Sequence, residues 1–185
     1  MWLFLASDAM GFVGLIGSYI VLRYSHPGAT WRPTTGEWGA EGAGLPSLAP
    51  VITGINTFIL IISSFTMVRA LDAIQRGNQR GLLTWLGATI LGGATFLGVQ
   101  VYEYAELLHH GLKMYSHPYG ATFYMCTGFH GAHVFAGVTY LTCIWIRAAR
   151  GAFTAENHSP VELVGLFWHF VDLVWIILFT IIYLF

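Results

Sequence analysis

Long apolar stretches separated by short polar segments are the main pattern of this sequence. Five stretches reach the roughly 20 residues that a helix needs to cross the hydrocarbon core of a bilayer. They lie at residues 1–24, 50–71, 81–108, 119–146 and 160–185. Apart from the Gly-, Pro- and Thr-rich segment between the first two, the connections are short, so neighbouring helices are expected to run antiparallel and pack together. The pattern predicts an all-α fold, an integral membrane bundle of five transmembrane helices that forms one domain over residues 1–185.

The composition supports a lipid-embedded chain. Of the 185 residues, 56% are hydrophobic and only 9% are Asp, Glu, Lys or Arg, whereas a soluble domain carries about a quarter charged residues. The net charge of −1 and the lack of a basic tract do not indicate nucleic-acid binding. Glycines recur inside the helices, where they are expected to let the backbones approach closely: Gly11, Gly14, Gly17, Gly87, Gly92, Gly93 and Gly98.

The basic residues predict the orientation, because Lys and Arg near helix ends are retained on the cytoplasmic side. Five border the connections expected on one side: Arg69, Arg76, Arg80, Arg147 and Arg150. Three lie on the other side: Arg23, Arg32 and Lys113. This bias places the N-terminus in the cytoplasm and the C-terminus outside.

Several polar side chains fall inside the apolar stretches, where a charge at the bilayer centre costs about 2.5 to 3.5 kcal/mol. Asp8 is a buried carboxyl in the first stretch, and further candidates follow along the chain: Gln100, Glu103, His130, His133, His169 and Asp172. Counting about 1.5 Å per residue from the helix ends gives five of them a similar depth: Asp8, His130, His133, His169 and Asp172. These five can meet in one polar layer, whereas Glu103 lies closer to the outer interface.

Three pairs of these residues have the i, i+3 spacing that places both members on one helix face: Glu103 with Glu106, His130 with His133, and His169 with Asp172. Di-iron bundles use carboxylates and histidines at this spacing, but the glutamates lie at a different depth from the histidines, so no metal site is predicted. The favoured role is hydrogen bonding that fixes helix packing. Proton handling by Asp8 or its neighbours is the alternative. A small proton channel or transporter and an independent metalloenzyme are the competing function classes.

Four strings resemble those of subunit III of the haem–copper terminal oxidases, the cytochrome c oxidase subunit 3 family. Residues 1–8 read MWLFLASD, where the family has an apolar run that ends in Ser-Glu, and residues 98–104 read GVQVYEY. Residues 127–134 read TGFHGAHV, and residues 168–175 read WHFVDLVW. The second helix adds Asn56-Thr57 and Ser63-Ser64, so matches occur in order along all five helices. The chain resembles the short five-helix form of the family, and Asp8 stands where Glu is typical, which keeps the acid but shortens its reach.

The resemblance implies a subunit without a redox centre or cofactor of its own. It implies packing on the catalytic subunit I, which holds haems and copper, among other respiratory subunits, and support of oxygen reduction coupled to proton pumping. It further implies bound phospholipid and a bacterial plasma membrane location. Asp8 becomes the buried carboxyl with a candidate proton role, and the other positions form a polar signature: Gln100, Glu103, His130, His133, His169 and Asp172. The equivalent subunit of a quinol oxidase or nitric oxide reductase stays open as an alternative.

Overall fold

Five long helices make up the fold in the computed structural model, which describes residues 1–25, 49–109, 114 and 118–184. The helices are α1 (Trp2–Ser25), α2 (Ala49–Gln75), α3 (Gln79–His109), α4 (Pro118–Ala149) and α5 (Ser159–Phe179), and a π-helical segment, η1 (Thr180–Leu184), follows α5. Five spans are long and apolar enough to cross a membrane, and the described residues contain no strand. The predicted all-α bundle of five transmembrane helices is therefore confirmed. Arg32 and Lys113, which entered the orientation argument, lie outside the described residues.

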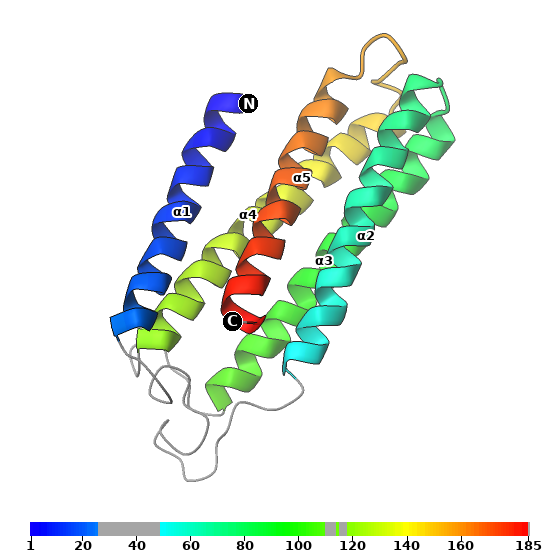
Figure 1. Cartoon of the computed structure of the whole chain (residues 1–185). Helices are drawn as coiled ribbons and strands as arrows, with labels where there is room; N and C mark the ends of the chain where they lie inside the picture. The colour runs from blue at the N-terminus through cyan, green and yellow to red at the C-terminus, as the bar shows by residue number, and fades with distance from the viewer. Residues whose placement is uncertain (26–48, 110–113, 115–117, 185) are drawn as a thin grey trace.

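The turn between α2 and α3 shows why these two helices pack side by side. The predicted second stretch ends at residue 71, but α2 continues to Gln75. Two residues later, Gly77 takes a positive φ of 72°, a backbone conformation that favours glycine and ends the helix. The side chain of Asn78 then accepts a hydrogen bond from the Gly81 N–H at 3.0 Å, which caps the start of α3. Two tightly connected helices can only return antiparallel, as Figure 1 shows.

Helix α1 lies at the edge of the bundle and packs against α4 and α5 (Figure 1). Its buried residues are Leu5, Phe12 and Tyr19, which repeat every seven positions, whereas Trp2 and Met10 are exposed. A seven-residue repeat is the spacing of a narrow left-handed helix-packing seam. Asp8 lies three residues after Leu5, and therefore on the same face of the helix. The packing of α1 thus turns Asp8 towards the bundle.

The centre of the bundle is built around Trp168 of α5, which is 1% exposed. A Cβ atom placed on Gly93 of α3 would lie 2.5 Å from the Trp168 ring, and one on Gly137 of α4 would lie 3.0 Å from it. The indole Nε1 donates a hydrogen bond to Ser63 Oγ of α2 at 3.1 Å. One side chain therefore contacts all three neighbouring helices. It fits only because α3 and α4 present no side chain there.

The predicted close approach at glycines holds for part of the set. A Cβ on Gly92 would lie 2.8 Å from Ser63 Cβ, and Gly93 is tighter still. In contrast, Gly14, Gly17 and Gly98 have no heavy atom within 4 Å of their Cβ positions among the described residues. The expectation is wrong for these three, because their helix faces point away from the neighbouring helices.

Replacing Gly93 by valine is expected to lower the free energy of unfolding by about 1 to 3 kcal/mol, since extra carbon atoms must displace Trp168 and Val138. Gly98→Val on the same helix is the matched control, because its Cβ position is open and valine has a higher helix propensity than glycine. Thermal unfolding of the purified chain in detergent measures both variants. Equal midpoints for Gly93→Val and Gly98→Val would contradict this packing.

Candidate functional site

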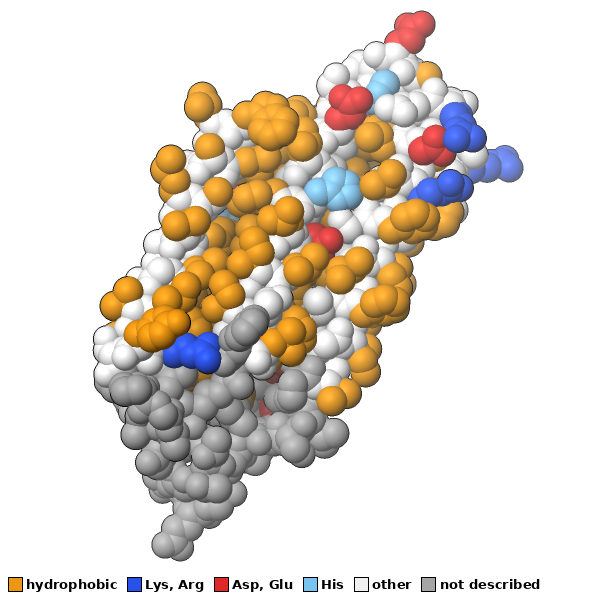
Figure 2. Space-filling model, in the orientation of Figure 1, with side chains coloured by type: hydrophobic (Ala, Val, Ile, Leu, Met, Phe, Trp, Pro, Cys, Tyr) orange, Lys and Arg blue, Asp and Glu red, His pale blue; other side chains and the backbone are white. Residues whose placement is uncertain are grey.

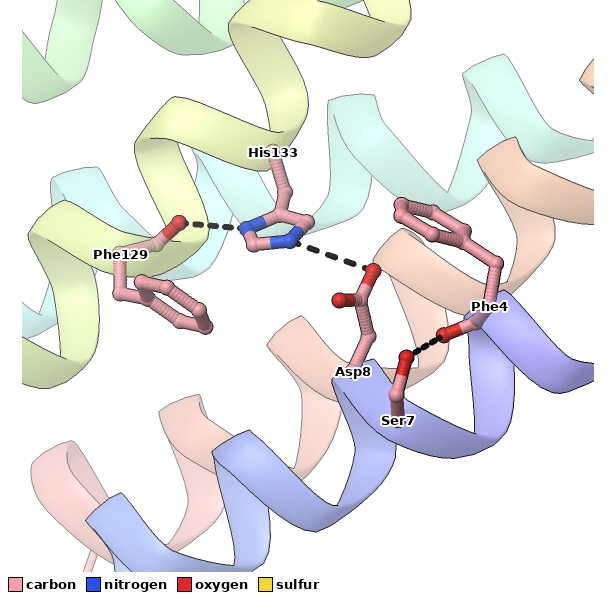
Figure 3. Close-up of polar contacts among 5 residues, drawn as sticks. All are labelled: Phe4, Ser7, Asp8, Phe129 and His133. Atoms are coloured by element: carbon pink, nitrogen blue, oxygen red, sulfur yellow. Dashed lines mark hydrogen bonds and ion pairs between the residues drawn. The ribbon is translucent and has the colours of Figure 1, made fainter.

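An ion pair joins α1 to α4 within the membrane span. Asp8 Oδ2 lies 3.3 Å from His133 Nε2, and the two side chains are only 16% and 15% exposed. The other ring nitrogen, Nδ1, lies 2.8 Å from the backbone carbonyl oxygen of Phe129 (Figure 3). Because a carbonyl oxygen only accepts hydrogen bonds, Nδ1 must carry a proton. Nε2 is therefore the ring nitrogen that faces Asp8, and it can carry a proton or leave that proton on the carboxyl.

With Nδ1 protonated, the pair can hold one further proton across the 3.3 Å between Nε2 and Oδ2. Either a carboxylate faces a protonated Nε2, or a protonated carboxyl faces a neutral Nε2. The net charge is zero in both arrangements, which lowers the cost of placing the pair in lipid. The rings of Phe12 and Phe129 lie 5.3 Å and 4.6 Å from the His133 ring and surround it with apolar surface. The site can hold one proton in two places without creating a net charge.

His130 occupies the core of the bundle, one helical turn from His133, and is 0% exposed. Its ring stacks on Trp175 at 4.7 Å and meets the edge of Phe96 at 5.8 Å. Neither ring nitrogen has a hydrogen-bond partner among the described residues. His130 therefore acts here as an aromatic packing element between α3, α4 and α5.

Gln100 and Glu103 connect α3 to its neighbours on either side. The Gln100 side chain donates to the Thr127 carbonyl oxygen on α4 at 2.9 Å, and Tyr104 shares a hydrogen bond of 2.6 Å with the Thr127 hydroxyl. On the other side, the Thr53 hydroxyl of α2 donates to the Glu103 carboxylate. These bonds fix α2, α3 and α4 relative to one another, which agrees with the packing role expected for polar groups in lipid.

His169 and Asp172 of α5 meet α2 rather than α1. His169 Nδ1 lies 2.6 Å from Ser64 Oγ, and Asp172 lies one turn further along α5. Asp172 is 7% exposed, and its Oδ1 has no hydrogen-bond partner in the described part of the chain. Histidine and acidic side chains interrupt the hydrophobic surface of the face drawn in Figure 2. The cluster is thus polar at a depth where its surroundings are apolar.

The structure separates the five residues that were expected to share one layer. Asp8 and His133 meet between α1 and α4, His130 lies in the core, and His169 and Asp172 lie between α5 and α2. Their pairing could not be read from depth alone. Thr53, Thr127 and Tyr104 were missed as members of the polar network. A signal existed for Tyr104, which lies four residues after Gln100 and so shares its helix face.

No group of three or more His, Cys, Asp or Glu side chains is placed to hold a metal ion within the residues that the structure describes. Two of the i, i+3 pairs that raised the di-iron alternative show the reason. His130 and His133 point to different neighbours, and Glu103 bonds to Thr53 of α2. The histidines and the glutamate are thus used by separate helix interfaces.

Comparisons with known proteins cover the chain from end to end. Residues 1–185 match the family described as Cytochrome c oxidase subunit III. The chain is 39% identical over 182 residues to cytochrome c oxidase subunit 3 of Thermostichus vulcanus, covering 98% of this chain and 83% of that protein. It is 37% identical over 183 residues to the Synechocystis protein of the same name, covering 98% and 72%. For the Corynebacterium diphtheriae protein, also named cytochrome c oxidase subunit 3, the identity is 40% over 182 residues, covering 97% and 83%.

The family strings met in the sequence lie on the helices that build the polar contacts. TGFHGAHV places His130 and His133 on α4, and WHFVDLVW places Trp168, His169 and Asp172 on α5. The match therefore includes the residues that fix the helices as well as the apolar stretches. With the five spanning helices and the match over residues 1–185, this chain belongs to the cytochrome c oxidase subunit III family.

Proposed function

We propose that this chain packs on catalytic subunit I of a haem–copper respiratory oxidase, where subunit I holds the haems and copper. The observation that carries the proposal is the family match over all 185 residues. As a subunit III, the chain belongs to an oxidase complex, an oxidoreductase, and is itself non-catalytic. The names of the relatives favour neither the channel or transporter alternative nor the quinol oxidase and nitric oxide reductase alternatives.

The proposed location is a bacterial plasma membrane, with the N-terminus in the cytoplasm, the C-terminus outside and phospholipid around the bundle. Basic side chains gather at the end of the molecule that carries the α2–α3 turn (Figure 2). There the Arg69 guanidinium lies over the Trp85 ring at 5.5 Å, and Arg147 lies 5.5 Å from the Phe153 ring. Arginine and tryptophan anchor helices at the interface, and basic residues favour the cytoplasmic side. The gathering of basic residues supports this orientation, and the ring contacts support an interfacial position of this end.

Purification through an affinity tag on this chain tests the proposed assembly. We expect a haem-bearing catalytic subunit to co-purify, and the reduced-minus-oxidised optical spectrum to show its haems. Proton flux through the isolated chain in liposomes, without any co-purifying haem protein, would support the channel alternative instead.

We further propose that the Asp8–His133 pair handles a proton that sustains oxidase turnover. The support is geometric: the Phe129 carbonyl oxygen holds the Nδ1 proton, which leaves Nε2 of His133, 3.3 Å from Asp8 Oδ2, as the ring nitrogen that can exchange a proton with the carboxyl. Each of the two arrangements is neutral, so neither carries the cost of a net charge in lipid. A pair of this kind at the edge helix α1 can pass a proton between Asp8 and His133 beside the catalytic subunit without itself carrying electrons.

Asp8→Asn is expected to leave assembly nearly intact and to shorten sustained turnover. The amide has nearly the same shape and can donate to Nε2, but it cannot exchange a proton. The measurement is oxygen consumption by the purified complex followed over many turnovers. Asp8→Glu, which restores the acid typical of the family, should retain activity. Ser7→Ala is the matched control, because within the described part of the chain the Ser7 hydroxyl bonds only to its own helix, at the Phe4 carbonyl. Failure to recover any complex with Asp8→Asn would make the carboxyl structural, and unchanged turnover would exclude a proton role.

A further inference from the structure

Arg69 of α2 is a charged side chain close to the edge of the hydrocarbon core. The middle residue of α2 (Ala49–Gln75) is Ile62, and Arg69 lies about 10 Å beyond it along the helix axis. The hydrocarbon core reaches about 15 Å to either side of the bilayer centre. In a helix centred in the bilayer, the Arg69 backbone therefore lies inside the core, at a depth from which a long side chain reaches the headgroups.

An aromatic ring, and not an acid, holds the Arg69 guanidinium. Its Cζ lies 5.5 Å from the centroid of the Trp85 ring of α3. Asp72, one turn further along α2, pairs with Arg76 at 2.9 Å, and no carboxylate pairs with Arg69 in the part of the chain that the structure describes. A guanidinium stacked on a ring can still donate hydrogen bonds from its edge, and it keeps its charge in proteins. The position therefore offers one positive charge, with oriented N–H donors, to an anion.

An exposed apolar track leads from Arg69 towards the bilayer centre. Phe65, Ile62 and Phe58 precede Arg69 by four, seven and eleven residues, which places all four side chains on one face of α2. The three apolar side chains are 60%, 46% and 62% exposed. We define the α2 track by Arg69, Phe65, Ile62 and Phe58. A charged end followed by an apolar stripe matches a phospholipid, whereas a free phosphate ion would use only the charged end.

We propose that Arg69, held by Trp85, binds the phosphate of a phospholipid whose headgroup carries a net negative charge, and that an acyl chain of this lipid lies along the α2 track. A zwitterionic headgroup brings its own cation, whereas an anionic one compensates the charge of Arg69. This inference rests on the proposed phospholipid surroundings of the bundle, to which it adds a residue and a headgroup charge. It does not depend on packing against subunit I, so the two proposals can fail independently.

Native mass spectrometry of the purified full chain in detergent tests the ligand. Phosphatidylglycerol and phosphatidylcholine with the same acyl chains are titrated separately, and sodium phosphate is added as a competitor. We expect phosphatidylglycerol to bind about fivefold more tightly than phosphatidylcholine, the factor that one basic residue contributes near an anionic membrane surface. We also expect sodium phosphate to leave the bound lipid in place. Equal binding of the two lipids would overturn the inference, and displacement by sodium phosphate would show a site for free phosphate instead.

The position of the site is tested by Arg69→Gln, which should lose the preference for phosphatidylglycerol. Arg80→Gln is the matched control and should keep it, because Arg80 is an exposed arginine in the first turn of α3 at the same end of the molecule. Equal losses in these two variants would show attraction to surface charge in general and would overturn the site.

Arg69→Lys serves as a second variant should Arg69→Gln fail to fold, which the thermal unfolding midpoint without added lipid reveals. Lysine keeps the charge but lacks the flat fork that stacks on Trp85. We expect Arg69→Lys to bind phosphatidylglycerol more weakly than the wild type. Binding equal to that of the wild type would refute the role of Trp85 in holding the charge.

Discussion

Trp168→Ala is expected to lower the free energy of unfolding by about 3 to 5 kcal/mol, the range for removing a large aromatic side chain from a packed core. Trp168 is 1% exposed and fits against the bare backbones at Gly93 and Gly137. Alanine leaves a cavity that these two glycines cannot fill, because neither has a side chain to move into it. The variant also removes the donor to Ser63 Oγ.

Thermal unfolding of the purified chain in detergent measures this loss, and Trp2→Ala is the control. Trp2 is 73% exposed on the edge helix α1, so its removal should change the midpoint little. Should both tryptophan variants unfold at the wild-type midpoint, Trp168 would not hold the helices together. If only Trp2→Ala lowered the unfolding midpoint strongly, the main packing contact would lie on α1 and not at Trp168.

His133→Leu is expected to destabilise the bundle by about 1 to 3 kcal/mol, because it leaves the Asp8 carboxyl at a helix interface without its partner. The remaining acid can become neutral by taking up a proton, but its O–H donor then has no acceptor at Nε2. The cost arises from the orphaned group and not from the loss of attraction alone. Adding Asp8→Leu to His133→Leu should therefore recover stability.

A double-mutant cycle isolates the coupling of this pair. The four proteins are wild type, Asp8→Leu, His133→Leu and the double variant, each followed by thermal unfolding in detergent. We expect the double variant to be more stable than His133→Leu and its loss to be smaller than the sum of the single losses. Strict additivity of the two losses would show that Asp8 and His133 do not interact.

The apolar stretches predicted the helices closely, as α4 illustrates. The stretch 119–146 became Pro118–Ala149, and its ends differ because hydropathy marks the part inside lipid, whereas backbone hydrogen bonds continue into the interface. The candidate residues were also recognisable, since Asp8 and His133 are costly in lipid wherever they point. Their pairing was not predictable, because the position of a residue along a helix gives its depth but not the rotation of the helix about its axis.

The glycines show the same division. Gly93 and Gly98 look alike in the sequence, yet one meets Trp168 and the other meets no heavy atom among the described residues. Which of them packs depends on the side of α3 that faces α5. That side is set by the summed contacts of the bundle and not by the residues next to each glycine.

By itself, the sequence determined that this chain has five membrane-spanning helices, that it carries ionisable groups within them and that it resembles oxidase subunit III. Those properties depend on hydrophobic length, residue type and order, which are local along the chain. Only the tertiary structure decided that Asp8 meets His133, that His130 packs on Trp175 and that His169 turns to Ser64. The reason is physical: each contact depends on how far each helix is rotated about its axis. Packing against the other helices sets that rotation.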